Sequence, residues 1–363
     1  MDVAIIGLPQ SGKTTLFNAL TGGHSASTGG SGSAAEMHVG VVKVPDPRPD
    51  VLAEMHQRKK VVYAEIKYWD LPGPEASAQP QIIGGRHRNI LQTADAYLMV
   101  IRAFNNPAVP YPSGDVDPGR DLTTMLAELA LADLEVLERG AQRLDDGIKK
   151  SKVAERPVLV RHGEALHKVK EAIESGITLR RQELAPSEAE FLVDYQLLTG
   201  KPVIVAFNTD EAGPELTLDR FGLDSSEIAG LGQVSLCGKL EEDLALMSDE
   251  DEAQFRRELG LGEAATPKVI RVSYETLGLV SFLTIGDDEV RAWSVPAGLP
   301  AQEAAGNVHS DFYKGFIRAE VIPYEDLVRC GSISQGRKEG VLRSEGKTYP
   351  VKDGDVINFL VNV

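Results

Sequence analysis

The sequence predicts an α/β nucleotide-binding fold with an inserted helical hairpin and a separate small α+β domain. Three observations lead to this prediction. An apolar run at residues 3–6 is followed by a glycine-rich loop and then by a helical segment. Between residues 122 and 148, leucines and methionine recur at three- and four-residue steps, which is typical of a long amphipathic helix. From residue 281 onward, short β-like runs alternate with Gly and Asp turns, which favours a second domain.

The composition is that of a globular chain with two or three domains, because 42% of its 363 residues are hydrophobic. No long apolar run and no basic leader are present, so we expect no membrane partner and no signal peptide. Cys237 and Cys330 form neither a disulfide framework nor a zinc pattern, which fits a cytoplasmic location. The net charge of −16 argues against broad nucleic-acid coating. We therefore expect no DNA partner, and any RNA contact must be local.

The loop at residues 7–14 reads Gly-Leu-Pro-Gln-Ser-Gly-Lys-Thr, which fits the phosphate-binding pattern G-x-x-x-x-G-K-[ST]. Its position between a strand and a helix favours nucleotide binding over a plain turn with a surface lysine, because the helix N-terminus attracts phosphates. The residues predicted to bind the nucleotide here are Gln10, Ser11, Gly12, Lys13, Thr14 and Thr15. Lys13 is the catalytic candidate, since it would reach the β- and γ-phosphates, and the Thr14 hydroxyl would bind Mg²⁺.

Two later segments lie where nucleotide-sensing switches are expected. Residues 21–35 are rich in Gly and Ser, and form either an unstructured loop or a switch that orders around a γ-phosphate. A strand is predicted at residues 39–44, a short helix at 50–56, and a further strand at 61–69. That last strand ends in Asp70-Leu-Pro-Gly73, the pattern D-x-x-G. An Asp at a strand end beside a phosphate loop is a typical Mg²⁺ ligand, so Asp70 joins Thr14 as a predicted metal residue.

The middle of the chain predicts buried strands at residues 94–102 and 202–207, with a helical hairpin between them. The hairpin helices are expected at 122–148 and 158–173, followed by a helix that starts at a capping box at 187–190 and ends near Gly200. Residues 149–181 carry nine Lys or Arg against four Asp or Glu. Two interpretations stay open for this basic segment: a solvated helix face, or a patch for RNA or an acidic partner.

The second buried strand ends in Asn208-Thr-Asp-Glu211, where guanine-nucleotide proteins carry N-K-x-D. In that motif the Asp accepts hydrogen bonds from guanine. Glu211 has one more methylene, which moves the carboxylate by roughly an ångström and leaves buried hydrogen bonds unpaired, so guanine selectivity should be weak. Asn208 and Glu211 are therefore predicted to bind the base. Ser235, in a short strand and loop at residues 234–237, is the predicted last base contact.

Together these residues resemble the YchF-type ATPases of the Obg-related translation-factor group of P-loop proteins. The most specific marks are Asn208-x-x-Glu211, Asp117-Pro-Gly-Arg-Asp121, and the runs at residues 309–322 and 345–359. The resemblance implies a Ras-like nucleotide domain (1–120 and 201–280), an inserted coiled coil (121–200) and a C-terminal TGS domain of β-grasp type (281–363). It also implies slow hydrolysis of ATP, with GTP as a second candidate. The expected partner is the ribosome or RNA, through the hairpin and the C-terminal domain.

The two switches depart from the pattern of that family. Ungapped counting puts Ala34 where the family has a Thr for Mg²⁺ and the γ-phosphate. Pro74 lies where Ras-like enzymes carry a water-orienting glutamine. Two functional hypotheses follow: a nucleotide-dependent switch that slowly hydrolyses ATP, and a scaffold that binds nucleotide without hydrolysing it. A small-molecule kinase is disfavoured, because no arginine-rich lid and no acceptor site is evident.

Overall fold

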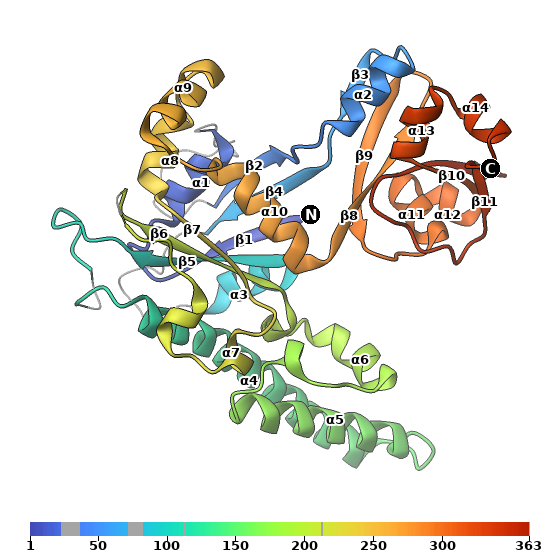
Figure 1. The fold of residues 1–363 in the computed structure, drawn as a ribbon. Coiled ribbons are helices and arrows are strands. Elements are labelled where there is room, and N and C mark those ends of the chain that lie inside the picture. Colours follow the sequence, from blue (N-terminus) through green and yellow to red (C-terminus); the bar gives the residue numbers. More distant parts are fainter. Residues whose placement is uncertain (23–36, 72–82, 112–113, 212, 363) are drawn as a thin grey trace. The chain divides into compact units, whose positions relative to one another are not determined.

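The computed structural model describes residues 1–22, 37–71, 83–111, 114–211 and 213–362 (Figure 1). The chain forms two compact units. The large unit comprises Asp2–Gly40 and Tyr68–Lys268, and the small unit comprises Met1, Val41–Lys67 and Val269–Val363. The expected switch positions Ala34, Gly73 and Pro74 lie outside the described residues.

A six-stranded sheet in the order β2-β4-β1-β5-β6-β7 forms the centre of the large unit. Its strands are β1 (Asp2–Ile6), β2 (His38–Lys43), β4 (Glu65–Asp70), β5 (Ala96–Ala103), β6 (Val203–Thr209) and β7 (Gly232–Leu236). The pairs β1–β5, β5–β6 and β6–β7 are parallel. Parallel strands are covered on both faces, which explains why β6 is buried along its whole length. The carboxyl ends of these four strands therefore meet at one edge of the sheet.

Helices of the large unit cover both faces of this sheet (Figure 1). The helix α1 (Lys13–Thr21) lies with α8 (Gly238–Leu244) on one side, and α3 (Gly85–Thr93) lies with the first half of α4 (Pro118–Lys150) on the other. Apolar residues of α4 pack with those of β5 and β6 in one core: Leu122, Met125, Leu129, Met99, Val205 and Phe207. The large unit also contains α7 (Ser225–Ile228), α9 (Asp249–Leu259), the first residues of α10 (Ala265–Leu277) and a 3₁₀ turn at Leu218–Phe221.

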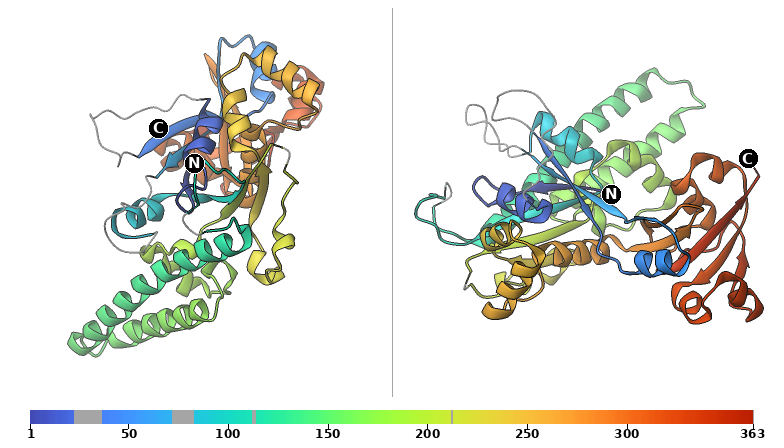
Figure 2. Two further views of the ribbon diagram at one scale, coloured as in Figure 1. Left: turned by 90° about the vertical axis from the view of Figure 1, so that its left-hand side faces the viewer. Right: turned by 90° about the horizontal axis from the view of Figure 1, so that it is seen from above.

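The predicted helical hairpin is confirmed. The long helix α4 continues past the sheet, and α5 (Arg156–Glu174) runs back along it, as both views of Figure 2 show. A separate core holds the hairpin together, with Leu137, Leu166, Val169, Ile173, Leu192 and Leu197. The buried carboxylate of Asp133 on α4 accepts the N–H groups of Leu198 at 2.7 Å and Thr199 at 2.8 Å. This ties the hairpin to the turn that precedes β6, and burial raises the pKa of Asp133.

The helix predicted from residue 187 to about Gly200 is wrong in extent. The helix α6 spans Pro186–Leu192, and 3₁₀ turns follow at Val193–Tyr195 and Leu198–Gly200. Pro186 starts the helix one residue before Ser187, which fits the preference of proline for the first helical turn. The Glu188 carboxylate accepts the N–H of Ala185 at 2.8 Å, so the glutamate caps the helix while Ser187 lies inside it.

The small unit contains a second six-stranded sheet in the order β11-β10-β12-β8-β9-β3. Its strands are β3 (Lys60–Val62), β8 (Leu279–Ile285), β9 (Glu289–Pro296), β10 (Phe316–Pro323), β11 (Arg343–Glu345) and β12 (Asp355–Val361). Its helices are α2 (Arg48–Met55), α11 (Ala301–Val308), α12 (Ser310–Lys314), α13 (Tyr324–Cys330) and α14 (Ile333–Lys338), with most of α10. Alanines of α11 pack on Phe282, Val321 and Phe359 of the sheet, which confirms a C-terminal domain of mixed α and β structure.

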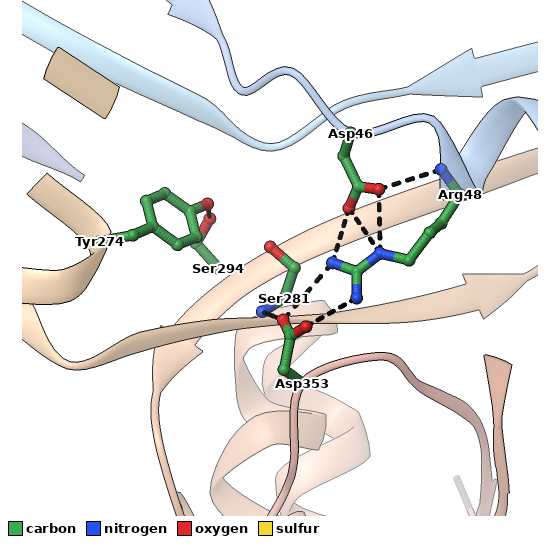
Figure 3. Close-up of polar contacts among 6 residues, drawn as sticks. All are labelled: Asp46, Arg48, Tyr274, Ser281, Ser294 and Asp353. Carbon is green, nitrogen blue, oxygen red and sulfur yellow. Dashed lines mark hydrogen bonds and ion pairs between the residues drawn. The ribbon is translucent and has the colours of Figure 1, made fainter. Parts of the chain in front are cut away.

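The segment Val41–Lys67 belongs to the small unit, although the sequence placed it in the nucleotide domain. The expected strand at 61–69 is split in two: β3 pairs in parallel with β9, and β4 joins the other sheet. Figure 3 shows how α2 is held: the Arg48 guanidinium lies between Asp46 and Asp353, with Nη1 2.7 Å from Asp353 Oδ2. Asp353 also accepts the N–H of Ser281 at 2.9 Å. The ion pair of Arg48 with Asp353 joins residues that are 305 positions apart, so no local pattern indicates it.

Candidate nucleotide-binding site

A cavity of about 630 Å³ lies at the carboxyl edge of the parallel strands in the large unit. Its walls come from the loop before α1, from the segment after β5, from the segment after β6 and from the start of α8. This edge is where open α/β sheets bind ligands, because the loops that follow neighbouring strands converge there. Of the predicted residues, Gln10, Gly12, Thr15, Asn208 and Glu211 line the cavity.

Two positions of the loop, Gly7 and Gly12, must be glycine because other backbone or side-chain atoms lie too close for a Cβ. A Cβ on Gly12 would lie 2.2 Å from the Asn208 Nδ2, and Gly12 has a φ of +94°. A Cβ on Gly7 would lie 2.4 Å from the carbonyl oxygen of Val100. The loop thus fits tightly between β5 and β6, and a side chain at either position would displace it.

Lys13 lies inside the curve of the loop. Its Nζ donates hydrogen bonds to the carbonyl oxygens of Gly7 at 3.1 Å and Leu8 at 3.0 Å. Burial lowers the pKa of Lys13, while the charge of Asp70 acts in the opposite direction. A compact cation in this position is suited to bind phosphate oxygens.

Thr14 and Asp70, the predicted metal residues, are in contact. Thr14 Oγ1 donates a hydrogen bond to Asp70 Oδ2 at 2.8 Å, and Asp70 is only 3% exposed. Its other oxygen, Oδ1, is buried and accepts no hydrogen bond from the residues that the structure describes. His38 Nδ1 lies 3.7 Å from Asp70 Oδ2.

This pair fits Mg²⁺. A buried carboxylate oxygen that lacks a donor is costly unless a cation or proton compensates for it. The described residues contain no cluster of three or more His, Cys, Asp or Glu that could hold a metal by itself. Mg²⁺ that is bound with a nucleotide needs only one or two protein ligands, because phosphates and waters supply the others.

The Asn208 side chain contacts backbone groups on both sides of it. Its Nδ2 donates to the carbonyl oxygen of Ser11 at 3.0 Å, and its Oδ1 accepts the N–H of Gly238 at 2.9 Å. Asn208 therefore holds the phosphate loop and the start of α8 in place. The predicted role of Asn208 in base binding stays a prediction.

The structure does not bring Ser235 into the cavity. The Ser235 hydroxyl accepts the N–H of Leu216 at 3.2 Å, and the wall is formed instead by Cys237 and Lys239. Ser235 is inside β7, whereas Cys237 follows the end of that strand. Because loops converge at the carboxyl ends of the strands, the first residue after β7, Cys237, was the better candidate for the cavity wall.

Arg102, at the end of β5, is a site residue that the sequence reasoning missed. It is 2% exposed, and its guanidinium donates to the carbonyl oxygens of Gln10 at 3.2 Å, Phe104 at 3.2 Å and Val109 at 2.9 Å. The guanidinium carbon lies 4.3 Å from the ring centre of Phe104 and 4.9 Å from that of Tyr111. Arg102 thus fixes the phosphate loop and the cavity wall together. The signal was a charged residue at the end of an apolar strand.

Comparison with known proteins shows the family of the chain. Residues 2–136 match the family described as "50S ribosome-binding GTPase". Residues 279–362 match the YchF GTPase C-terminal family, described as "Protein of unknown function (DUF933)". The chain is 35% identical to the "Ribosome-binding ATPase YchF" of Bacillus subtilis over 370 residues, which cover 100% of both chains. The chain belongs to the YchF family.

A YchF member from Escherichia coli O157:H7 is 36% identical over 365 residues, which cover 99% of this chain and 98% of the relative. The solved structure of the Schizosaccharomyces pombe YchF GTPase matches with a TM-score of 0.83 and 27% identity, and covers 99% of this chain and 97% of that one. The predicted fold class is therefore confirmed: a Ras-like P-loop domain with a helical insertion, followed by a C-terminal domain, as in YchF proteins.

Proposed function

We propose that this chain is a nucleotide-dependent switch that binds ATP, hydrolyses it slowly and associates with the ribosome in the cytoplasm. The observation that carries the proposal is the contact of Thr14 with Asp70, whose second oxygen is buried without a donor among the described residues. The YchF relatives of B. subtilis and E. coli O157:H7, similar over nearly the whole chain, are named ribosome-binding ATPases. The boundaries 1–120 with 201–280, 121–200 and 281–363 remain our proposed functional division, with Val41–Lys67 structurally part of the small unit.

Each group in the site has a role in this function. Thr14 and Asp70 would hold Mg²⁺, which neutralises the charge that develops on the transferred phosphate. Lys13 would bind the β- and γ-phosphates, with the backbone of residues 10–15 around them. Glu211, exposed at the cavity wall, would accept hydrogen bonds from the base. The Phe104 ring, which also lines the cavity, would provide an apolar surface for the base. GTP is the second candidate nucleotide.

We place the ribosome contact on the hairpin and on the C-terminal domain. In the basic segment at 149–181, Lys149, Lys168 and Lys170 form ion pairs within the hairpin region. Lys152 and Arg156 are exposed at the turn between α4 and α5. Exposed cations at the far end of a long hairpin are suited to bind RNA phosphates.

Single-turnover hydrolysis of ATP tests the proposal, with and without ribosomes. A site of this type, without a partner, should turn over at about 10⁻⁴ to 10⁻³ per second. We expect wild type to exceed a Lys13→Ala control, and ribosomes to raise the rate. If the wild-type rate is no greater than that of Lys13→Ala, even with ribosomes, the chain is not an ATPase. It would then be a scaffold that binds nucleotide without hydrolysing it. Calorimetric titration with ATP and GTP analogues shows which nucleotide is bound.

A further inference from the structure

A second cavity in the large unit is lined by a half-buried arginine whose guanidinium nitrogens are fully buried and have no hydrogen-bond partner among the described residues. The cavity has a volume of about 180 Å³ and lies between α4, the end of α5, the turn at Leu179–Arg181 and the segment around α7. Arg180 lines it, and all three of its guanidinium nitrogens are buried without a hydrogen-bond partner in the described chain. Thr178 also lines the cavity, and its hydroxyl is buried with no hydrogen-bond partner among the residues that the structure describes. This cavity has no part in the nucleotide site described above.

Such an arrangement is costly unless a ligand compensates for it. A buried charge is normally paired, and a guanidinium with none of its donors satisfied is unfavourable in an apolar setting. The cavity lining also includes the apolar residues Leu126, Ala130 and Ile173. Burial lowers the pKa of Arg180 to about 10, and the neighbouring charge of Arg181 acts in the same direction.

The acidic residue at this cavity does not serve as the missing partner. Glu227 lines the cavity but is exposed, and its Oε2 accepts the N–H of Asp224 at 3.2 Å in a helix cap. Arg181 also lines the cavity, so among the lining residues two arginines stand against the one carboxylate of Glu227; Asp224, which interacts with the charge of Arg181, does not line it. The charge of the cavity therefore favours an anion.

We infer that the cavity lined by Thr178, Arg180 and Arg181 binds a phosphate group. The planar guanidinium of arginine matches two oxygens of such a group at once. A tetrahedral phosphate offers two oxygens to the guanidinium and leaves a further oxygen for the Thr178 hydroxyl. The volume is several times the roughly 30 Å³ that one water occupies in the liquid, so there is room for the group. The phosphate comes either from an RNA strand or from a free phosphate compound.

Thermal unfolding of the full chain tests this inference, with the nucleotide site saturated by a non-hydrolysable ATP analogue and Mg²⁺. Inorganic phosphate is titrated against chloride at matched ionic strength. We expect phosphate to raise the Tm of wild type in a saturable way, and to leave the Tm of Arg180→Met unchanged. Without phosphate, Arg180→Met should be at least as stable as wild type, because an unpaired buried charge has been removed.

The matched control is Arg161→Met, which removes an exposed arginine from α5 in the same basic segment. This variant should keep the full response to phosphate. The inference is wrong if phosphate does not raise the Tm of wild type, or if phosphate raises the Tm of wild type and Arg180→Met equally. If Arg180→Met does not fold, Thr178→Val provides the second test: the Kd for phosphate should rise about tenfold, which corresponds to one lost hydrogen bond to a charged group. An unchanged Kd contradicts the inference.

The source of the phosphate is decided by anisotropy of a labelled single-stranded RNA. If RNA supplies it, Arg180→Met weakens RNA binding and inorganic phosphate competes. If a free compound supplies it, Arg180→Met loses the rise in Tm with phosphate but binds the RNA as tightly as wild type. The RNA arm rests on the proposed ribosome association. That proposal fails by itself if wild type does not sediment with ribosomes while the phosphate response persists.

Discussion

Thr14 and Asp70 are 56 positions apart in the chain, yet the hydroxyl of one donates a hydrogen bond to the carboxylate of the other at 2.8 Å. The contact joins the first residues of α1 to the last residue of β4. It brings the two predicted metal residues together at the edge of the sheet where the phosphate loop lies.

Asp70→Asn should remove the Mg²⁺ dependence of nucleotide binding, because the amide carries no charge for the cation. We expect the affinity for an ATP analogue with Mg²⁺ to fall by about 10- to 100-fold. The affinity without Mg²⁺ should change little. Titration calorimetry under both conditions measures this, with Asp145→Asn, an exposed carboxylate on α4, as the control. If Asp70→Asn lowers the affinity for the ATP analogue equally with and without Mg²⁺, the role of Asp70 is purely structural.

Asn208→Asp should weaken both the fold and nucleotide binding. The substitution keeps the acceptor for the Gly238 N–H but puts a second oxygen against the Ser11 carbonyl. We expect a loss of about 1–3 kcal/mol in the free energy of unfolding, measured with urea, and weaker binding of the ATP analogue. Asn89→Asp, exposed on α3, makes the same chemical change away from the site. Similar stability of the two variants would contradict the positioning role of Asn208.

The double variant Glu211→Asp with Thr209→Lys should shift preference towards GTP. It shortens the carboxylate at the cavity wall and restores the lysine of the guanine-binding motif. We expect the ratio of the ATP- and GTP-analogue Kd values to change by at least about tenfold. Thr209 is 7% exposed, so Glu211→Asp alone serves as the control for any strain from the lysine. An unchanged ratio would exclude Glu211 from base binding.

Arg102→Lys should destabilise the site although the charge is kept. An ammonium has neither the planar donor geometry of the guanidinium nor its stacking on aromatic rings, so carbonyl oxygens of residues 10, 104 and 109 would lose donors. We expect a loss of about 3 kcal/mol in unfolding free energy and a raised KM for ATP. Arg139→Lys, whose side chain is 66% exposed, is the matched control. A loss confined to about 0.5 kcal/mol, as for surface changes, would show that Arg102 is dispensable.

The sequence predicted those features that depend on local patterns. The loop at residues 7–14, the carboxylate at the end of β4 and the hairpin all follow from short motifs or helical periodicity, and the strands at 94–102 and 202–207 correspond to β5 and β6. The features that it did not predict depend on distant residues. Arg102 contacts the phosphate loop because β5 ends beside Gln10. Ser235 does not line the cavity, since it lies within β7, where its hydroxyl accepts the N–H of Leu216. The expected strand at 61–69 is divided because its first part, β3, pairs with β9. The sequence around residues 61–69 cannot show this pairing, since β9 lies far along the chain.

The pairing of β3 with β9 also has a consequence for the order in which the protein can form during its synthesis. Lys60 and Glu289 are 229 positions apart and form an ion pair in register across these two strands. The early segment with α2 and β3 therefore leaves the translating ribosome long before its partner strand exists. Until β9 is made, the edge of β3 that pairs with it stays open, while residues Tyr68–Lys268 of the large unit are made and fold. A fragment that ends at the close of the large unit would keep that edge open permanently, so we expect it to aggregate where the full-length chain does not.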